Sequence, residues 1–358
     1  MAGLGDRDRA VSVFIQTLGS LPGIGPRSVQ NILVMKHAEI CSAGLLDEAF
    51  ARGLEIKAVD KALAREGVSW NACEQAAGEI MERAEREGLS VLNPLMPEYP
   101  QRLLRNRRFP PVLFVRGDAA ALNADRSVAI VGSREPTEFG AEMARRLAAL
   151  LAEDGYAVVS GLALGSDSAG HEGALDAGGV TVAVLSTPVE GAVYPRQNQG
   201  LAERIVEGGG ALVSEYAPGV PIPQRQFASN LVARDEWQPA LADGIIAVET
   251  SVKGGTKHAL RAARDTQTPI AVFDYRSRHG VDFLGDPRFG GNVAYLREGL
   301  ASPLFGPETI EAFKTRMDRY RSAYRNVHWD DGGGGATDAA DDAIAIKVDQ
   351  DGQTGFIL

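Results

Sequence analysis

The stretch Val128–Thr137 reads VAIVGSREPT and decides the fold class. Four consecutive apolar residues predict a strand, Ser127–Val131, that is buried on both faces. Gly-Ser-Arg follows it shortly before an amphipathic stretch, Phe139–Glu153. Similar apolar runs alternate with helical stretches further along the chain. They are Ala157–Ser160, Val180–Leu185, Ala211–Ser214, Gly244–Val248 and Pro269–Phe273. This alternation predicts an α/β fold with a Rossmann-like, doubly wound and mostly parallel sheet.

Composition divides the chain into four segments. Residues 1–92 have a helical pattern and predict a small N-terminal all-helical module of the helix-hairpin-helix or SAM-like kind. Residues 93–308 carry the alternating strands and helices of the Rossmann-like domain. A last helix is expected within 309–329. The acidic tail, 330–358, is rich in Gly and Asp and is expected to be disordered, because it has too few apolar residues for a core.

The charge of the chain is concentrated in that tail. The formal net charge is −10, which argues against a surface that is basic throughout. Residues 330–358 contain seven Asp and one Lys, a net of −6, so the other residues carry −10 − (−6) = −4. The body of the protein is therefore only mildly acidic, and a nucleic-acid partner is not excluded.

Cysteine content and hydropathy indicate the compartment. Cys41 and Cys73 are the two cysteines, which excludes a disulfide scaffold and a cysteine zinc site. The N-terminus lacks the apolar segment of a signal peptide, and no apolar run approaches the roughly 20 residues of a membrane helix. We expect a cytoplasmic protein with no membrane segment.

Three glycine-bearing turns follow predicted strands. Each offers backbone amides to an anion, and glycine lets a phosphate come close. Any one of them could be a purely structural turn. Because the carboxyl ends of parallel strands meet at one edge of the sheet, together they predict a shared phosphate-binding site. Its residues are Gly132, Ser133, Arg134, Ser160, Gly161, Gly165, Lys253, Gly254, Gly255 and Thr256.

Other residues near these turns have structural interpretations. Ser166 and Asp167 are candidate N-caps of the helix that follows the second turn, and Thr256 is a candidate N-cap after the third. His171 is expected to be a packed, hydrogen-bonded residue, because nothing in the sequence pairs it with a nucleophile. No Walker A loop is present. We expect no catalytic residue, no metal and no cofactor.

The N-terminal segment contains a second candidate contact. Leu21–Val29 reads LPGIGPRSV, a Pro-Gly-hydrophobic-Gly turn typical of a helix-hairpin-helix. The amides near Gly23 and Gly25, together with Arg27, could hold a nucleic-acid phosphate without base recognition. A purely structural hairpin in a helical module remains an equal alternative.

From about Tyr99 to Tyr275 the chain resembles the DNA-processing protein A family (DprA, also called Smf). The resemblance rests on an ordered series of motifs over about half of the chain rather than on any single one. The series is Tyr99-Pro100, Pro111–Gly117, Val131–Arg134, Ser160–Ala163 with Gly165, Asp167 and His171, Gly178–Leu185, Tyr194-Pro195 with Asn198, Ser214-Glu215 and Gly254–Thr256.

This resemblance implies a non-enzymatic protein that binds single-stranded DNA without sequence specificity. It also implies a homodimer that loads a RecA-type recombinase in recombination and natural transformation. It adds Arg234 to the phosphate-binding positions. The chain departs from the family pattern at Leu164, where an arginine is usual, and at Asp235 and Glu236, where an Arg-Asn-Arg signature continues. The carboxylates of Asp235 and Glu236 would repel a phosphate and weaken the binding of a DNA strand.

Two other functions stay open at this point. The same sheet edge could serve a nucleotide-binding sensor or a nucleotide-processing enzyme. Lys253–Ala259 keeps part of the glycine-rich loop of phosphoribohydrolases but lacks its glutamate. A structural partner protein with a vestigial site is the third possibility. The acidic tail is either a solvated terminus or a DNA mimic that competes with the strand.

Overall fold

The computed structural model describes residues 5–105 and 109–324, which all lie in one compact unit, Met1–Val327. The predicted acidic tail, 330–358, lies outside the described residues, and so do the last residues of the helix expected within 309–329. The division of the chain at residue 92 stays a prediction.

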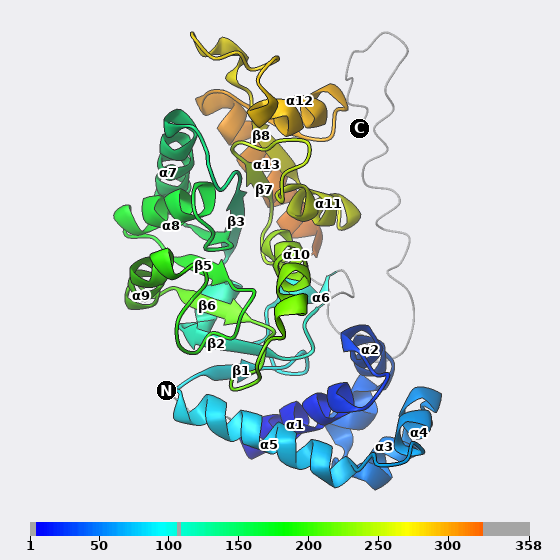
Figure 1. The fold of residues 1–358 in the computed structure, drawn as a ribbon. Helices are drawn as coiled ribbons and strands as arrows, with labels where there is room; N and C mark the ends of the chain where they lie inside the picture. The colour runs from blue at the N-terminus through cyan, green and yellow to red at the C-terminus, as the bar shows by residue number, and fades with distance from the viewer. Residues whose placement is uncertain (1–4, 106–108, 325–358) are drawn as a thin grey trace. The chain divides into compact units, whose positions relative to one another are not determined.

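The N-terminal part of the chain is helical, as Figure 1 shows in blue. A turn at Leu21–Gly25 separates the first two helices, and Gly23 in it has a φ of 88°, a conformation that favours glycine. Pro26 begins the second helix, where its missing N–H costs no hydrogen bond. The helices are α1 (Asp6–Ser20), α2 (Pro26–Ser42), α3 (Glu48–Gly53), α4 (Lys57–Leu63) and α5 (Trp70–Arg86).

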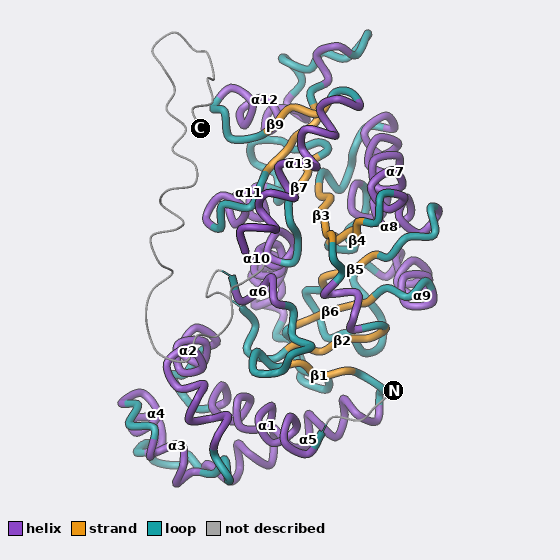
Figure 2. The backbone as a smooth tube through the Cα atoms, turned by 180° about the vertical axis from the view of Figure 1, so that it is seen from behind, coloured by secondary structure: helices purple, strands orange, loops and turns teal. Residues whose placement is uncertain are grey.

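The rest of the described chain is built on a nine-stranded sheet of order β1-β2-β6-β5-β4-β3-β7-β8-β9, seen from behind in Figure 2. From β6 to β9 in this order all neighbouring strands are parallel, whereas β2 pairs antiparallel with β6 and β1 pairs antiparallel with β2. The strands are β1 (Ser90–Leu92), β2 (Leu113–Gly117), β3 (Arg126–Val131), β4 (Tyr156–Ser160), β5 (Thr181–Val184), β6 (Ala211–Ser214), β7 (Ile245–Ala247), β8 (Ile270–Phe273) and β9 (Ser302–Leu304).

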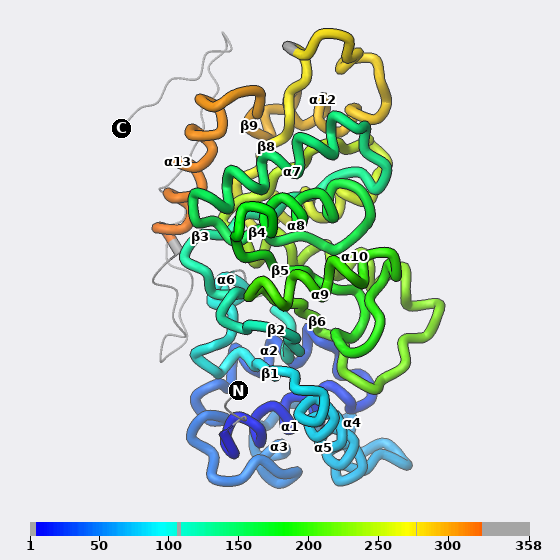
Figure 3. The backbone as a smooth tube through the Cα atoms, turned by 90° about the vertical axis from the view of Figure 1, so that its left-hand side faces the viewer, coloured from blue at the N-terminus to red at the C-terminus, as the bar shows by residue number. Residues whose placement is uncertain are grey.

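Helices cover both faces of this sheet. In Figures 1 and 3, α7, α8 and α9 stack on one face, while α10 and α11 lie on the other. The helices of this part are α6 (Gln101–Leu104), α7 (Glu138–Glu153), α8 (Ser166–Asp176), α9 (Gln199–Glu207), α10 (Gln224–Ala240), α11 (Lys257–Asp265), α12 (Gly290–Arg297) and α13 (Pro307–Tyr324). Because both faces are covered, the central strands are mostly apolar, with polar residues confined to their ends.

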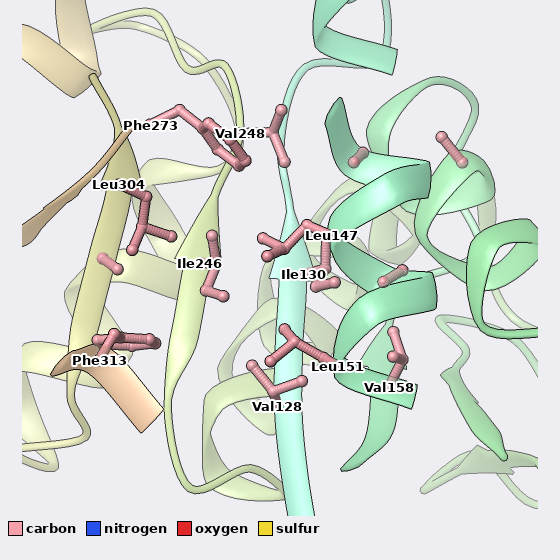
Figure 4. Close-up of a cluster of buried hydrophobic side chains, with 14 of the residues drawn as sticks. Val128, Ile130, Leu147, Leu151, Val158, Ile246, Val248, Phe273, Leu304 and Phe313 are labelled. Atoms are coloured by element: carbon pink, nitrogen blue, oxygen red, sulfur yellow. The ribbon is translucent and has the colours of Figure 1, made fainter. Parts of the chain in front are cut away.

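The core between β3 and α7 fixes the ends of the central strands. Leu147 and Leu151 of α7 pack against Val128 and Ile130 of β3, and all four side chains are buried (Figure 4). A close-packed interior of this kind is rigid. The loops that leave β3 and its neighbours therefore start from fixed positions.

The predicted fold class is confirmed, and β3 to β8 agree with the six predicted runs to within one residue at each end. Strands β1, β2 and β9 were not predicted. β1 and β9 are three-residue strands at the two edges of the sheet and carry no long apolar run, whereas β2 lies between β1 and β6 and its apolar start, Leu113–Val115, was missed. Helix α10 was also missed, because its apolar residues do not gather on one face. No described helix is both long and apolar enough to cross a membrane.

Candidate nucleic-acid interface

The loops after β3 and β7 leave the sheet at the point where its strand order reverses. Strands β4, β5 and β6 follow β3 on one side, while β7, β8 and β9 lie on the other. In open α/β sheets, ligands bind outside the carboxyl ends of the strands at such a switch point. The turns that contain Arg134 and Lys253 are therefore placed where this architecture binds ligands.

The structure brings the three predicted turns together and holds them with hydrogen bonds. The amide of Ser133 donates to the carbonyl oxygen of Glu249 at 2.7 Å, which joins the loops after β3 and β7. The amide of Ser166 donates to the Ser133 carbonyl oxygen at 3.0 Å and joins the loop after β4. The hydroxyl of Thr256 donates to the Gly132 carbonyl oxygen at 3.0 Å. The three loops thus form one connected platform.

Two glycines are needed for these loops to approach each other. A Cβ on Gly132 would lie 2.4 Å from Oγ of Ser166, and a Cβ on Gly165 would lie 2.5 Å from the Ser133 carbonyl oxygen. Gly165 also has a φ of 82° and precedes α8 as its N-cap. The predicted caps Ser166 and Asp167 were wrong, because both residues already lie in the first turn of α8.

Exposed cations and open backbone lie on the solvent side of the platform. Arg134 and Lys253 are both exposed. A Cβ on Gly255 would meet no atom within 4 Å, so the backbone there is open to a ligand, whereas Gly254 lies in a turn against Ser251. The residues can present two flexible cations beside accessible backbone, an arrangement suited to phosphate oxygens.

Arg234 is placed beneath the platform rather than on it. Its side chain comes from α10, is 4% exposed, and lies so close to Gly161 that a Cβ there would be 1.1 Å from its Nη1 atom. Its nearest carboxylates are Asp167 at 3.7 Å and Asp235 at 3.5 Å. Nε and Nη1 of Arg234 have no hydrogen-bond partner among the described residues. In this arrangement Arg234 can position the loop after β4. Its charge acts on the platform from inside the protein and not from the solvent side.

Asp167 and His171 of α8 complete the buried cluster around Arg234. The Asp167 carboxylate accepts hydrogen bonds from the amides of Gly161 and Ala163, at 3.2 and 3.3 Å. Burial raises the pKa of Asp167, while Arg234 and these amides oppose the rise. Burial, assisted by Arg234, lowers the pKa of His171 to about 3.

The tautomer of His171 follows from its partner. Thr181 donates its hydroxyl proton to the Val158 carbonyl oxygen, and the same Thr181 oxygen lies 2.7 Å from Nδ1 of His171. Nδ1 must therefore carry the imidazole proton and donate it to Thr181. His171 is a neutral, packed residue, as the sequence interpretation favoured.

The three departures from the family pattern have different surroundings. Leu164 is 41% exposed at the tip of the loop after β4, where an arginine would reach solvent.

Asp235 is mostly buried and accepts a hydrogen bond from Nε2 of Gln238 at 3.1 Å. Burial raises the pKa of Asp235 to about 6, with Asp167 adding to the rise while Arg234 and Arg134 oppose it. Glu236 is half-buried on the same helix. The carboxylate of Asp235 is thus an internal anion beside both arginines.

A second internal anion fills the N-terminus of α7. The carboxylate of Glu249 accepts hydrogen bonds from the amide and the hydroxyl of Thr137, at 2.9 and 2.6 Å. A Cβ on Gly140 would lie 2.1 Å from Oε1 of Glu249, so the fit is close. Rossmann-type proteins place a nucleotide pyrophosphate at the helix N-terminus that follows the first strand. Here that position is occupied by a side chain, a feature that the sequence analysis missed.

The predicted N-terminal hairpin lies between α1 and α2. Gly23, Gly25 and Arg27 are all exposed in it, and the guanidinium of Arg65 lies 3.3 Å from the position of a Cβ on Gly23. The geometry is that of a helical hairpin with accessible backbone and two nearby arginines. Its role as a nucleic-acid contact stays a prediction. Among the described residues, no group of three His, Cys, Asp or Glu side chains could hold a metal ion.

The sequence matches a family model over most of the sheet-bearing part. Residues 90–311 match the family described as DNA recombination-mediator protein A. The chain belongs to this family. The match includes all three loops of the platform together with α10 and α11.

Curated relatives agree with this family. The chain is 36% identical over 165 residues to Protein Smf of Escherichia coli, an alignment that covers 46% of this chain and 42% of the relative. It is 26% identical over 246 residues to the DNA processing protein DprA of Bacillus subtilis, covering 68% of this chain and 78% of the relative. Protein Smf of Synechocystis is matched over 51% of its length. The chain spans about half the length of the E. coli and Synechocystis relatives.

Two solved structures share the fold. DNA processing protein A of Helicobacter pylori superposes with a TM-score of 0.54 at 26% identity, covering 65% of this chain and 97% of that one. DprA of Streptococcus pneumoniae superposes with a TM-score of 0.63 at 23% identity, covering 84% of this chain and 95% of that one. The first similarity agrees with the family assignment, and the second shows the shared fold.

Proposed function

We propose that the chain binds single-stranded DNA through its phosphates, without sequence specificity, in DNA processing and recombination. The observation that carries the proposal is the platform of three interlocked loops at the switch point, which exposes Arg134 and Lys253. Phosphate contacts of this kind position a strand but read no bases. The H. pylori relative is itself a single-stranded DNA-binding protein.

The nucleotide-binding alternative is less well supported. Its pyrophosphate would have to replace the Glu249 carboxylate, which already accepts two hydrogen bonds at Thr137. Removing a buried carboxylate from such partners is unfavourable. A DNA strand that contacts only the solvent side of the platform leaves Glu249 in place.

The remaining parts of the proposal rest on family membership. They are a RecA-type recombinase as a partner, a homodimer as the active form, and action in the cytoplasm. The hairpin with Gly23, Gly25 and Arg27 is proposed as a second strand contact. Of the predicted phosphate-binding residues, the proposal gives direct contacts to the exposed ones, Arg134, Lys253 and Gly255. Ser160 is buried with its hydroxyl donated to the Ile130 carbonyl oxygen, and it supports the loop together with Arg234.

A salt series tests the proposal. We expect a fluorescent oligo-dT to bind the wild-type protein at low salt, and its affinity to fall steeply as salt rises. Arg134→Ala and Lys253→Ala should each weaken binding and flatten the dependence of log K on log salt by about 0.7, the value for one lost phosphate contact on a single strand. Arg86→Ala, an exposed arginine of α5, is the matched control.

Two results would overturn the proposal. One is the absence of strand binding by the wild-type protein at low salt. The other is strand binding that neither Arg134→Ala nor Lys253→Ala changes. Competition by ATP or ADP at the same platform would instead favour the nucleotide-binding function.

A further inference from the structure

Helix α11 presents a row of cations to solvent. Lys257, Arg261 and Arg264 are all exposed and stand at positions i, i+4 and i+7, which places them on one face of the helix. The apolar residues of α11, including Leu260 and Ala263, are buried on the opposite side. We call these three residues the α11 cation row.

The side chains of the α11 cation row form no ion pair with a described residue, although Asp265 stands at i+4 from Arg261 at the end of the helix. The side chains of Lys257 and Arg261 make no hydrogen bond or ion pair with any described residue. Arg264 is hydrogen-bonded to the hydroxyl of Tyr295, a neutral partner. By contrast, Arg145 and Arg146 of α7, on the other face of the sheet, pair with Asp176 and Glu142. In a chain of net charge −10, such unpaired cations on one helix face are a specific feature.

The row continues from the platform without a break. Helix α11 begins directly after the loop that carries Lys253, and the Thr256 hydroxyl ties its start to the loop after β3. Figure 1 shows α11 beside β7 on the face that it shares with α10. From Lys257 to Arg264 the helix rises about 10 Å, the length of about three phosphates of a stacked strand.

The chemistry of the row fits a phosphate backbone better than a protein surface. Protein interfaces depend on buried apolar or aromatic anchors at their centre. The exposed side of α11 offers none of its own, because its leucine and alanines face inward. Long cationic side chains at regular spacing are instead suited to a flexible chain of phosphates.

Resting on the proposed function, we infer that a DNA strand held at Arg134 and Lys253 continues along α11 and is bound there by Lys257, Arg261 and Arg264. The α11 cation row thereby extends the binding site. It contributes to the affinity of long strands and not to that of strands that only fill the platform.

A charge-reversal pair tests this path. Lys257→Glu/Arg261→Glu is compared with Arg86→Glu/Arg319→Glu, which changes the net charge equally at exposed arginines of α5 and α13. Binding is measured for oligo-dT of about six and about thirty nucleotides, lengths near the lower end of and well above common single-strand site sizes of about 4 to 16 nucleotides. For the long strand we expect the α11 variant to bind about tenfold more weakly or worse, with a salt slope lower by about 1.4.

The short strand and the control separate the possible results. The six-nucleotide strand should bind the α11 variant and the control alike. Equal losses in the α11 variant and the control for the long strand would overturn the inference, and so would equal losses for both lengths in the α11 variant. If the wild-type protein binds neither strand, the proposed function itself fails. Lys257→Gln/Arg261→Gln repeats the test, should the reversal alter the melting curve.

Discussion

One arginine is buried at the amino edge of the sheet, where the parallel strands begin, and another at the carboxyl edge, where they end. The two arginines are paired very differently. Arg102, 6% exposed at the amino edge, donates to both oxygens of Asp243 at 2.9 and 2.8 Å and to the carbonyl oxygens of Ala124 and Asp125. Arg234, at the carboxyl edge, has carboxylates only at 3.5 and 3.7 Å. Arg102 is a closed structural link, whereas Arg234 keeps unused donors.

This difference shows how one sheet can be stable at one edge and available for binding at the other. A fully paired buried ion contributes only if both partners stay in place, and removing one is costly. The loosely paired arginine at the carboxyl edge lies below the loops that expose Arg134 and Lys253. Its two carboxylate partners lie at 3.5 and 3.7 Å without a hydrogen bond to Nε or Nη1, so Arg234 is held more loosely than Arg102.

The largest expected effect on stability follows from breaking the ion pair between Arg102 and Asp243. Arg102→Met leaves the Asp243 carboxylate buried with weaker partners, Arg105 at 3.4 Å and the Ser127 amide. We expect the free energy of unfolding to fall by about 3 kcal/mol, measured by urea denaturation. Arg102→Met/Asp243→Leu should recover much of this loss. A fall below about 1 kcal/mol for the single variant would show that the link is not structural.

An intermediate effect is expected at Asp235. Because burial raises its pKa to about 6 in the folded state, above the ordinary 3.8, the native protein binds more protons than the unfolded chain between these values. The contribution of Asp235 to the stability of the wild-type protein should therefore become more favourable as pH falls from neutral toward 4. Asp235→Asn removes the charged form and should raise the free energy of unfolding at neutral pH by about 1 to 3 kcal/mol.

Strand binding gives a second measurement on the same variant. Loss of the negative charge beside Arg134 and Arg234 should strengthen oligo-dT binding near neutral pH, and the gain should shrink as pH approaches 5. Equal pH dependence of stability in Asp235→Asn and the wild type would contradict the assignment of this group.

The smallest effect on stability is expected at Arg234. Arg234→Met leaves Asp167 with its two amide partners and Asp235 with Gln238. Because burial already raises the pKa of both carboxyl groups, they can take up protons instead of staying charged, so we expect a loss of about 1 kcal/mol. Its effect on oligo-dT affinity should nevertheless exceed that of Arg102→Met. If the two variants rank in the opposite order in the binding assay, the comparison of the edges fails.

Much of this fold could be predicted because the central strands are buried on both faces. Such strands contain nearly continuous apolar runs, as in Val128–Val131, and their alternation with helices along the chain indicates a parallel sheet. Strand β9, which contains Pro303, and the three-residue β1 carry no such signal. Their positions depend on neighbours distant in sequence.

The candidate site was predictable only in part, for a related reason. That the three glycine turns meet follows from the topology of parallel strands. The burial of Arg234 against Gly161 and the placement of Glu249 at the start of α7 do not, because both depend on contacts between distant segments. The unpaired state of the α11 cation row likewise depends on which acids lie near it.

Amide hydrogen exchange with and without a bound oligo-dT tests the central claim most directly. The account predicts slower exchange in the strand complex within the loops 132–137, 161–165 and 251–256, with no change around Asp125 and Asp243 at the amino edge. Protection centred on the amino edge, or strand binding that leaves all three loops unprotected, would contradict it.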